Sequence, residues 1–535
     1  MFRGLRRRTT LCIAAICAVL FVVTCQTGYH VLHKQLSDVT LTTRSQKVIN
    51  PEFRGKPYKT VHLDLKGAPP KLNYLRKILP ILAAAGCDAL LIEYEDMFPY
   101  RGKLANLSAG NAYTRQQIKT LLSWAHDLNI EVIPLVQTFG HLEFALKLQE
   151  FKHLREVPNF PQEVCPSRDD SFSLIEEMLR QVMLIHKGIK YLHIGADEVF
   201  HLAVCSECMA RSLTSKEIYA EYLSKVAEHI HSTYPGVKPI IWDDMIRSSP
   251  HLVGTTKLPQ LVEPMIWAYS PDVPQLISRH VMYWYTKYFD QIWIAGAFKG
   301  ASLPTSLLPN LELRFLNQIS WIQFLKRIDE PKIAGYVLTG WSRFDHFAVL
   351  CELLPPALPS LLLNLHLISL ACNNQSIHEQ YLYKKWLTSL SCPNNLHFTS
   401  TSLKNDNKKI ISCNFPGVDL YEIIINLIEI KSKINEMEET LTKAQGWMTK
   451  YNVNHNYTNP WYMQDYKNLY VHNAVKDVIS FKNYTKLTLN QYFDKHTINE
   501  WIEQNIEPLF ATLRYLDKTT SQLMSRTVWQ RRPLV

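Results

Sequence analysis

Two carboxylates stand side by side at the end of an apolar run. The run YLHIG begins at Tyr191, passes through Gly195 and Ala196, and ends in Asp197 and Glu198. Two such groups can divide acid-base work, because one can hold a proton for a leaving group while the other stays ionised. A random Asp-Glu pair is more often a solvated acidic turn. The position of this pair in the fold therefore decides between the two interpretations.

Three tryptophans occupy comparable positions farther along the chain. Trp242, Trp267 and Trp341 each lie at or near the end of a later apolar run. A single tryptophan is more often part of a core, but three at equivalent strand ends are less readily explained in that way. Aromatic faces at the mouth of a pocket suit the C–H face of a sugar and the methyl of an acetamido group.

The elements that position these side chains are eight short β-type runs separated by helical patterns. Near-continuous apolar strands indicate a buried parallel sheet, and eight of them within about 300 residues predict an α/β fold, the (β/α)8 TIM barrel. In this fold the carboxyl ends of the strands form the active-site face. A doubly wound open sheet is the alternative, although no dinucleotide-binding glycine fingerprint follows the first run. The runs begin at Val61, Ala89, Glu131, Tyr191, Pro239, Met265, Gln291 and Ile333.

The chain up to residue 372 divides into four parts. We predict a basic tail over residues 1–10, an apolar signal anchor over 11–29, a stem over 30–57 and the barrel over 58–372. Basic residues before the apolar run favour a single-pass type II membrane protein with a lumenal body, with the Golgi as one candidate. A cleaved signal peptide is the alternative. Acceptor sequences for N-glycans fit a lumenal body and occur at Asn106, Asn374, Asn456 and Asn483.

Residues 373–535 have the pattern of an all-helical domain. Long amphipathic stretches run from Tyr421 to Trp447 and from Ile498 to Met524. Packing or association, including a possible homodimer, is the expected role of this part.

Charge and cysteine content limit the classes of function. The net charge is +10, but basic residues are spread along the chain beyond the first ten positions, so we expect no nucleic-acid partner. Cys205 and Cys208 form a C-x-x-C without a second pair at zinc-site spacing, which favours a local disulfide. We expect no metal and no organic cofactor.

The segment HIGADE matches the H-x-G-x-D-E signature of family 20 glycoside hydrolases, the β-N-acetylhexosaminidases. Further segments that resemble this family, such as HLDLKGAPP at His62 and VIPLVQTFGHLEF at Val132, extend the likeness over residues 58–370. The resemblance implies exo-hydrolysis of terminal, non-reducing, β-linked N-acetylglucosamine or N-acetylgalactosamine from glycoconjugates, with retained configuration.

The mechanism implied by the resemblance is substrate-assisted, so no enzyme carboxylate attacks the sugar. The 2-acetamido oxygen attacks the anomeric carbon. Carried over by motif, Asp197 stays ionised, orients the amide and stabilises the oxazolinium charge. Glu198 must keep a proton for the leaving oxygen and then acts as the base. His141 resembles the family histidine that binds the acid, with Asp96 as its expected orienter.

The other predicted substrate-binding residues include departures from the family pattern. Where better-known members carry an arginine after the first strand, this chain has Asp64 and Lys66, and Arg343 stands where a glutamate normally follows the last tryptophan. The tyrosine that binds the acetamido carbonyl has three candidates, which are Tyr269, Tyr283 and Tyr285. The set is completed by His193 in the signature and Asp244 in the WDDM segment.

Two other functions remain open at this point. One is a carbohydrate-binding pseudoenzyme that keeps the barrel and its tryptophans without turnover. The other is a barrel hydrolase for a different glycosidic or amide-bearing substrate. Retention of both Asp197 and Glu198 favours an enzyme, because a lectin needs no proton donor.

Overall fold

The computed structural model describes residues 51–534 except 52, 54, 329–331, 406 and 533. These residues belong to one compact unit that extends from Ile49 to Val535. The predicted basic tail, signal anchor and most of the stem lie outside the described residues. The structure holds one chain, so the possible homodimer stays a prediction.

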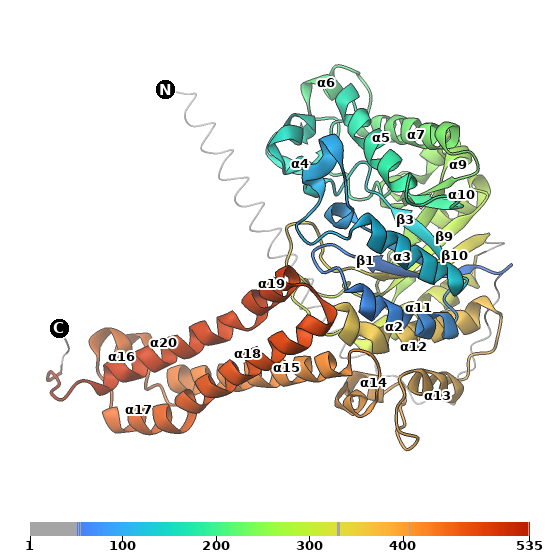
Figure 1. Ribbon diagram of the computed structural model, residues 1–535. Helices are drawn as coiled ribbons and strands as arrows, with labels where there is room; N and C mark the ends of the chain where they lie inside the picture. The colour runs from blue at the N-terminus through green and yellow to red at the C-terminus, as the bar shows by residue number, and fades with distance from the viewer. Residues whose placement is uncertain are drawn as a thin grey trace, which may run out of the picture. The chain divides into compact units, whose positions relative to one another are not determined.

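Eight parallel strands close into a barrel, with helices around it (Figure 1). All eight predicted strands are present, and the prediction of a TIM barrel is confirmed. The open-sheet alternative is wrong, because the first and last strands pair, with Tyr58 opposite Gly335. Around the barrel the strands are β1 (Tyr58–Asp64), β10 (Ile333–Gly340), β9 (Ile292–Lys299), β8 (Glu263–Trp267), β7 (Lys238–Trp242), β6 (Tyr191–His193), β3 (Glu131–Leu135) and β2 (Ala89–Glu93).

Side chains that alternate along the strands fill the barrel interior. Leu91, Ile133, Ile240 and Trp293 are among the members of this inner apolar cluster, and all four are almost fully buried. A filled interior leaves room for a ligand only at the ends of the strands, where polar residues follow the apolar runs.

The helices of the barrel pack around this sheet. They are α2 (Leu72–Ala84), α3 (Arg115–Asp127), α5 (Asp169–Met183), α7 (Ser215–Thr233), α10 (Arg279–Tyr288), α11 (Leu311–Leu325) and α12 (Leu354–Cys372). The predicted N-cap at Thr114 is confirmed, since its hydroxyl and the Gln117 side chain form a capping box. Among the described helices, α12 alone is long and apolar enough to cross a membrane, but 94% of its apolar window is buried in the fold, as in a core helix.

A hairpin between β3 and α5 escaped the sequence analysis. Its strands β4 (Arg155–Val157) and β5 (Phe160–Val164) pair in antiparallel fashion and are too short for a periodic pattern.

The predicted disulfide between Cys205 and Cys208 is wrong. The Cys205 sulfur accepts the Cys208 N–H at the start of α6 (Ser206–Met209), and Cys165 lies beside both thiols.

The chain after Cys372 is helical, as predicted. The long helix predicted over 421–447 ends earlier, because α15 (Val418–Glu439) passes into a π-helical turn at Thr440–Ala444. A disulfide joins Cys392 to Cys413 in this region. The other helices are α13 (Glu379–Ser389), α14 (Ser402–Asn405), α16 (Lys450–His455), α17 (Pro460–Tyr466), α18 (His472–Tyr492), α19 (Lys495–Asn505) and α20 (Glu507–Met524).

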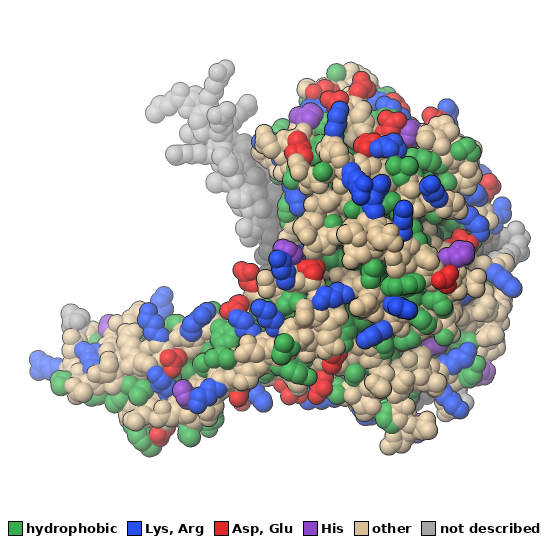
Figure 2. Space-filling model, in the orientation of Figure 1, with side chains coloured by type: hydrophobic (Ala, Val, Ile, Leu, Met, Phe, Trp, Pro, Cys, Tyr) green, Lys and Arg blue, Asp and Glu red, His purple; other side chains and the backbone are tan. Residues whose placement is uncertain are grey.

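The surface shown in Figure 2 carries basic and acidic side chains interspersed with one another. This distribution agrees with the spread of charge along the sequence.

Candidate active site

A cavity of about 220 Å³ opens at the carboxyl ends of the barrel strands. Both carboxylates of the adjacent pair line it, and so do all three tryptophans. Of the predicted site residues, the cavity is lined by Asp197, Glu198, His141, Trp242, Trp267, Trp341, Tyr269, Lys66 and Arg343. Four predicted residues, Asp64, Asp96, His193 and Asp244, are not among its walls.

The turn after β6 presents the two carboxylates in an unusual backbone conformation. Gly195, Ala196 and Glu198 have φ values of +64°, +70° and +49°. Left-handed backbone is uncommon for residues other than glycine, and it concentrates at functional sites. Gly195 has no substitute here, because a Cβ at this position would collide with the side chain of Gln137. The strand end can therefore turn sharply enough to aim both side chains into the cavity.

His141 contacts both carboxylates of the pair. Its Nε2 lies 3.2 Å from a Glu198 oxygen and 3.5 Å from an Asp197 oxygen. Its Nδ1 faces Glu143 at 3.8 Å. The prediction that Asp96 orients His141 is therefore wrong.

Asp96 belongs to a different pair. It lies in the short 3-10 turn Glu95–Met97, and its carboxylate lies 3.8 Å from Nε2 of His346. The other ring nitrogen of His346 is 3.1 Å from Glu95. These three groups lie close enough to share a metal ion, but the imidazole already faces both carboxylates.

Burial and neighbouring charges shift the pKa values of Asp197 and His141. Burial raises the pKa of Asp197 to about 7, and the nearby charge of His141 opposes this rise. For His141, burial disfavours the charged form, but Asp197, Glu143 and Glu198 together hold its pKa well above the usual value. The surrounding carboxylates therefore favour the charged form of His141, and the pKa of Asp197 lies near neutrality. Asp197 was expected to stay ionised, and its burial makes that charge dependent on pH.

Aromatic rings form a large part of the cavity wall, and the Lys66 ammonium lies 5.5 Å from the centre of the Trp341 ring. The rings of Trp242 and Trp341 are 5.7 Å apart, and Trp267 stacks on Tyr269 at 5.3 Å. The Tyr269 oxygen accepts a hydrogen bond of 3.1 Å from the Trp341 indole N–H. Of the three candidate tyrosines, Tyr269 alone lines the cavity. Tyr283 is 57% exposed on α10, and Tyr285 is buried against Asp243.

Lys66 lies at the centre of a buried acidic cluster. Its ammonium is 3.2 Å from Glu95, 3.5 Å from Glu93 and 3.7 Å from Asp64. Burial disfavours the charged lysine, but these carboxylates raise its pKa well above the usual value. Sequence reasoning missed Glu93, which lines the cavity and stands at the end of β2. Its place as the last residue of an apolar strand could have identified it.

Asp64, His193 and Asp244 support the walls rather than form them. Asp64 accepts the Ser342 N–H at 2.7 Å, and His193 accepts the Gly195 N–H at 3.0 Å. Asp244 accepts the Glu198 N–H at 2.9 Å and the Trp267 indole N–H at 3.3 Å. None of the three lines the cavity, so their placement does not support the prediction that they bind substrate directly. The second ring nitrogen of His193 has no hydrogen-bond partner among the described residues.

Arg343 connects the cavity to the C-terminal helices. One terminal nitrogen of its guanidinium bonds Glu500 on α19 at 2.6 Å, and the other bonds the Ala348 carbonyl at 2.6 Å. The Gln504 side chain exchanges two hydrogen bonds with the backbone of Leu350 on the same loop. The helical region therefore holds the loop that follows β10, which the sequence did not indicate.

Glu500→Gln is expected to raise KM about tenfold, because Arg343 loses the charge that fixes its position. Steady-state kinetics on a small aryl glycoside measure the effect, and Glu503→Gln on the same helix is the control. An unchanged KM in Glu500→Gln would show that the helical region does not influence the site.

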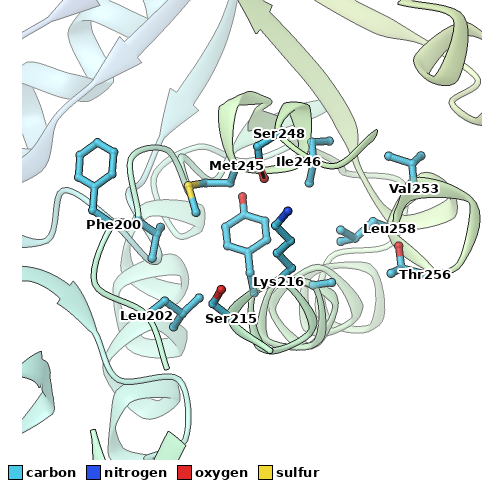
Figure 3. Close-up of a pocket in the computed structure, with 13 residues that line it drawn as sticks. Phe200, Leu202, Ser215, Lys216, Met245, Ile246, Ser248, Val253, Thr256 and Leu258 are labelled. Atoms are coloured by element: carbon cyan, nitrogen blue, oxygen red, sulfur yellow. Dashed lines mark hydrogen bonds between the residues drawn. The ribbon is translucent and has the colours of Figure 1, made fainter. Parts of the chain in front are cut away.

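A second cavity, of about 250 Å³, is lined in part by Phe200 and Leu202 (Figure 3). Its walls are mainly apolar, including Met245 and Ile246, and Lys216 extends among them. No carboxylate lines this cavity, so it lacks the groups that acid-base chemistry requires. The tryptophan-lined cavity is the candidate active site.

A parallel barrel with an acidic pair, a histidine that contacts both carboxylates and an aromatic wall at its catalytic face has the features of a glycoside hydrolase. The model of the glycosyl hydrolase family 20 catalytic domain matches residues 83–281. The chain is 34% identical over 477 residues to hexosaminidase D of Homo sapiens, covering 87% of this chain and 94% of the human protein. It is 42% identical over 309 residues to hexosaminidase D of Bos taurus, covering 57% and 89%.

This chain therefore belongs to glycoside hydrolase family 20, and it is a β-N-acetylhexosaminidase. Among solved structures, a chitobiase of Flavobacterium johnsoniae is 13% identical, with a TM-score of 0.48, over 89% of this chain and 71% of that one. The human alignment is longer than the barrel, so it extends into the helical region.

Proposed function

We propose that the enzyme removes terminal, non-reducing N-acetylglucosamine or N-acetylgalactosamine from glycoconjugates by a retaining, substrate-assisted mechanism. The observation that carries this proposal concerns the hydrogen bonding of the Asp197 carboxylate. One of its oxygens is buried and accepts no hydrogen bond from any described residue. An unpaired buried carboxylate oxygen on a cavity wall is an acceptor for a ligand N–H, and an acetamido group supplies one.

Glu198 has the position of a proton donor. Its side chain is 37% exposed at the mouth, whereas that of Asp197 is 10% exposed. The leaving group of an exo-acting enzyme points out of the pocket, so the more exposed carboxyl group meets the glycosidic oxygen. His141 contacts Glu198 at 3.2 Å and fixes its orientation. Glu198 then serves as base for the water that opens the oxazolinium.

The size of the cavity supports binding of a single sugar unit. Its volume of about 220 Å³ is below the range of about 300–1,000 Å³ that is typical of drug-sized ligands. The tryptophans would cover the apolar face and methyl group of one N-acetylhexosamine, with the Tyr269 hydroxyl at the acetamido carbonyl. Lys66 and Arg343 line the cavity in place of the usual family residues, and a sugar hydroxyl there would share their N–H groups with the acceptors that already hold them.

Hydrolysis of p-nitrophenyl β-N-acetylglucosaminide and of its galacto isomer tests the activity, and the anomer released first, observed by NMR, tests retention. A thiazoline analogue of the oxazoline is expected to inhibit competitively, because it resembles the cyclic intermediate. Release of the α-anomer, or failure of the thiazoline to inhibit, would contradict the mechanism.

The pKa of Asp197 makes activity depend on pH. Only the ionised form can orient the amide, so kcat/KM is expected to fall about tenfold per pH unit below about pH 7. A pH profile of kcat/KM reports the free enzyme and checks this value. A flat profile down to the ordinary aspartate pKa of about 3.9 would show that burial does not control this group.

We also propose a single-pass type II membrane topology with the barrel in the lumen of the secretory pathway. The basic start of the sequence supports it, and so does the disulfide between Cys392 and Cys413, because such bonds persist in oxidising compartments. Membrane retention together with glycans sensitive to endoglycosidase is the expected result. An unglycosylated product in the cytosol would contradict the topology.

A further inference from the structure

Three thiols and a carboxylate converge beside the active site without taking part in it. Cys165 follows β5, Cys205 and Cys208 lie at the start of α6, and Glu156 belongs to β4. One atom of each group lies within 4.8 Å of the others. The Cys165 sulfur is 3.3 Å from that of Cys205 and 3.7 Å from that of Cys208. The Cys208 sulfur is 3.3 Å from a Glu156 oxygen.

These separations are close to the edges of a tetrahedral zinc site. Zinc binds sulfur at about 2.3 Å and carboxylate oxygen at about 2.0–2.2 Å, so tetrahedral neighbours lie about 3.5–3.8 Å apart. A disulfide requires about 2.05 Å between two sulfurs and would leave the third thiol unpaired. The four groups surround one point, whereas a disulfide would draw two of them together.

The local backbone already supports anionic ligands. The Cys208 N–H points at the Cys205 sulfur at 3.3 Å, and the N–H groups of Val204 and Cys205 hold one Glu156 oxygen at 2.8 and 3.0 Å. The other Glu156 oxygen accepts a hydrogen bond from the Cys208 thiol and faces the cluster. Arg168 and Arg211 flank these groups. Arg168 bonds Glu207, and Arg211 bonds Ser167 and Glu221.

We propose that Cys165, Cys205, Cys208 and Glu156 bind one Zn²⁺ as a closed structural site. Binding releases the thiol protons, and three sulfurs with one carboxylate form a donor set that zinc accepts. Four protein ligands leave no open position, so the ion has a structural rather than a catalytic role. The sequence pointed instead to an absence of metal, because Cys165 lies 40 residues before Cys205 and is joined to it only by the fold.

The ion fastens the loop after Glu198 to the β4–β5 hairpin. The same hairpin already holds that loop at two other places, through Gln162 to the Glu198 carbonyl and through Glu163 to the N–H groups of Phe200 and His201. Zinc bound by Glu156 of the hairpin and by Cys205 and Cys208 of the loop would add a further link between the two segments. Loss of the ion is expected to lower the melting temperature of the enzyme.

Metal analysis of the full chain, purified without chelator or added metal, tests the site. The expected result is about one zinc per chain. After denaturation in chelator, all three thiols should react with iodoacetamide. A cross-linked peptide that joins Cys165 to Cys205 or Cys208 would overturn the proposal, and so would three free thiols in a metal-free chain. These measurements do not depend on activity, so their failure is distinct from failure of the proposed function.

Cobalt substitution tests the ligand set. Co²⁺ is expected to give the visible bands of a tetrahedral thiolate complex, and Cys205→Ser and Glu156→Gln should each weaken or abolish them. Cys87→Ala removes a buried thiol outside the cluster and should keep both the bands and the zinc. If Cys205→Ser fails to fold, release of zinc from the wild type by a thiol-blocking reagent provides the same test. Retention of zinc after blocking would contradict thiolate ligation.

Discussion

Glu198→Gln is expected to lower kcat for an unactivated disaccharide about 10²- to 10⁴-fold, because glutamine cannot protonate the leaving oxygen. The loss should be much smaller for the first step on a p-nitrophenyl glycoside, whose leaving group departs without a proton. Comparison of kcat/KM for N,N′-diacetylchitobiose and the aryl glycoside measures this difference. Glutamine has nearly the same shape as glutamate. This substitution therefore disturbs the contact with His141 less than removal of the side chain would.

Azide separates the role of base from that of acid. It attacks the oxazolinium without base assistance, so it should restore turnover of the aryl glycoside by Glu198→Gln and form a β-glycosyl azide. Glu221→Gln is the matched control, since that exposed glutamate pairs with Arg211 away from the cavity. Equal losses for both substrates, with no rescue by azide, would assign Glu198 to sugar binding rather than proton transfer.

The barrel was predictable because each strand is a short apolar run with its own turn signals. Helix signals were equally local, as the capping box at Thr114 shows. The ends of elements were less predictable. Alternating charges continue past Glu439, but the α-helix there gives way to a π-turn, whose Leu441 belongs to an apolar cluster with residues of α16, α17 and α20. Periodicity reports amphipathic character and does not separate α-helical from π-helical backbone.

The site was predictable where its residues are consecutive and unpredictable where the fold brings distant residues together. The acidic pair lies within one signature, and the tryptophans lie at strand ends. Glu143 could replace Asp96 as partner of His141 only because a 3-10 turn directs Asp96 toward His346. The contact between Arg343 and Glu500 spans 157 residues and depends on where α19 packs. No local pattern contains that information.

Hydrogen bonds within the protein explain why several residues that were predicted to contact the substrate hold the surrounding loops instead. Asp64 and Asp244 are carboxylates at strand ends, as the prediction required. Backbone N–H groups bond both oxygens of Asp64, and a backbone N–H and the Trp267 indole N–H bond those of Asp244. A carboxylate that is already bonded has little to offer a sugar. Asp197 differs because one of its oxygens has no hydrogen-bond partner among the described residues. A substitution of Asp197 is therefore the clearest test of whether the acetamido group takes part in the reaction.

Asp197→Asn is expected to lower kcat about 10²- to 10³-fold, because the neutral amide cannot stabilise the oxazolinium charge. The same substitution should weaken the thiazoline inhibitor by a similar factor, since that inhibitor carries the features of the intermediate. Affinity for the product N-acetylglucosamine, which lacks the positive charge, should change little. Asp127→Asn, on the exposed end of α3, is the control. If Asp197→Asn weakens product and thiazoline equally, the carboxylate contributes uniform binding, and participation of the acetamido group would need another explanation.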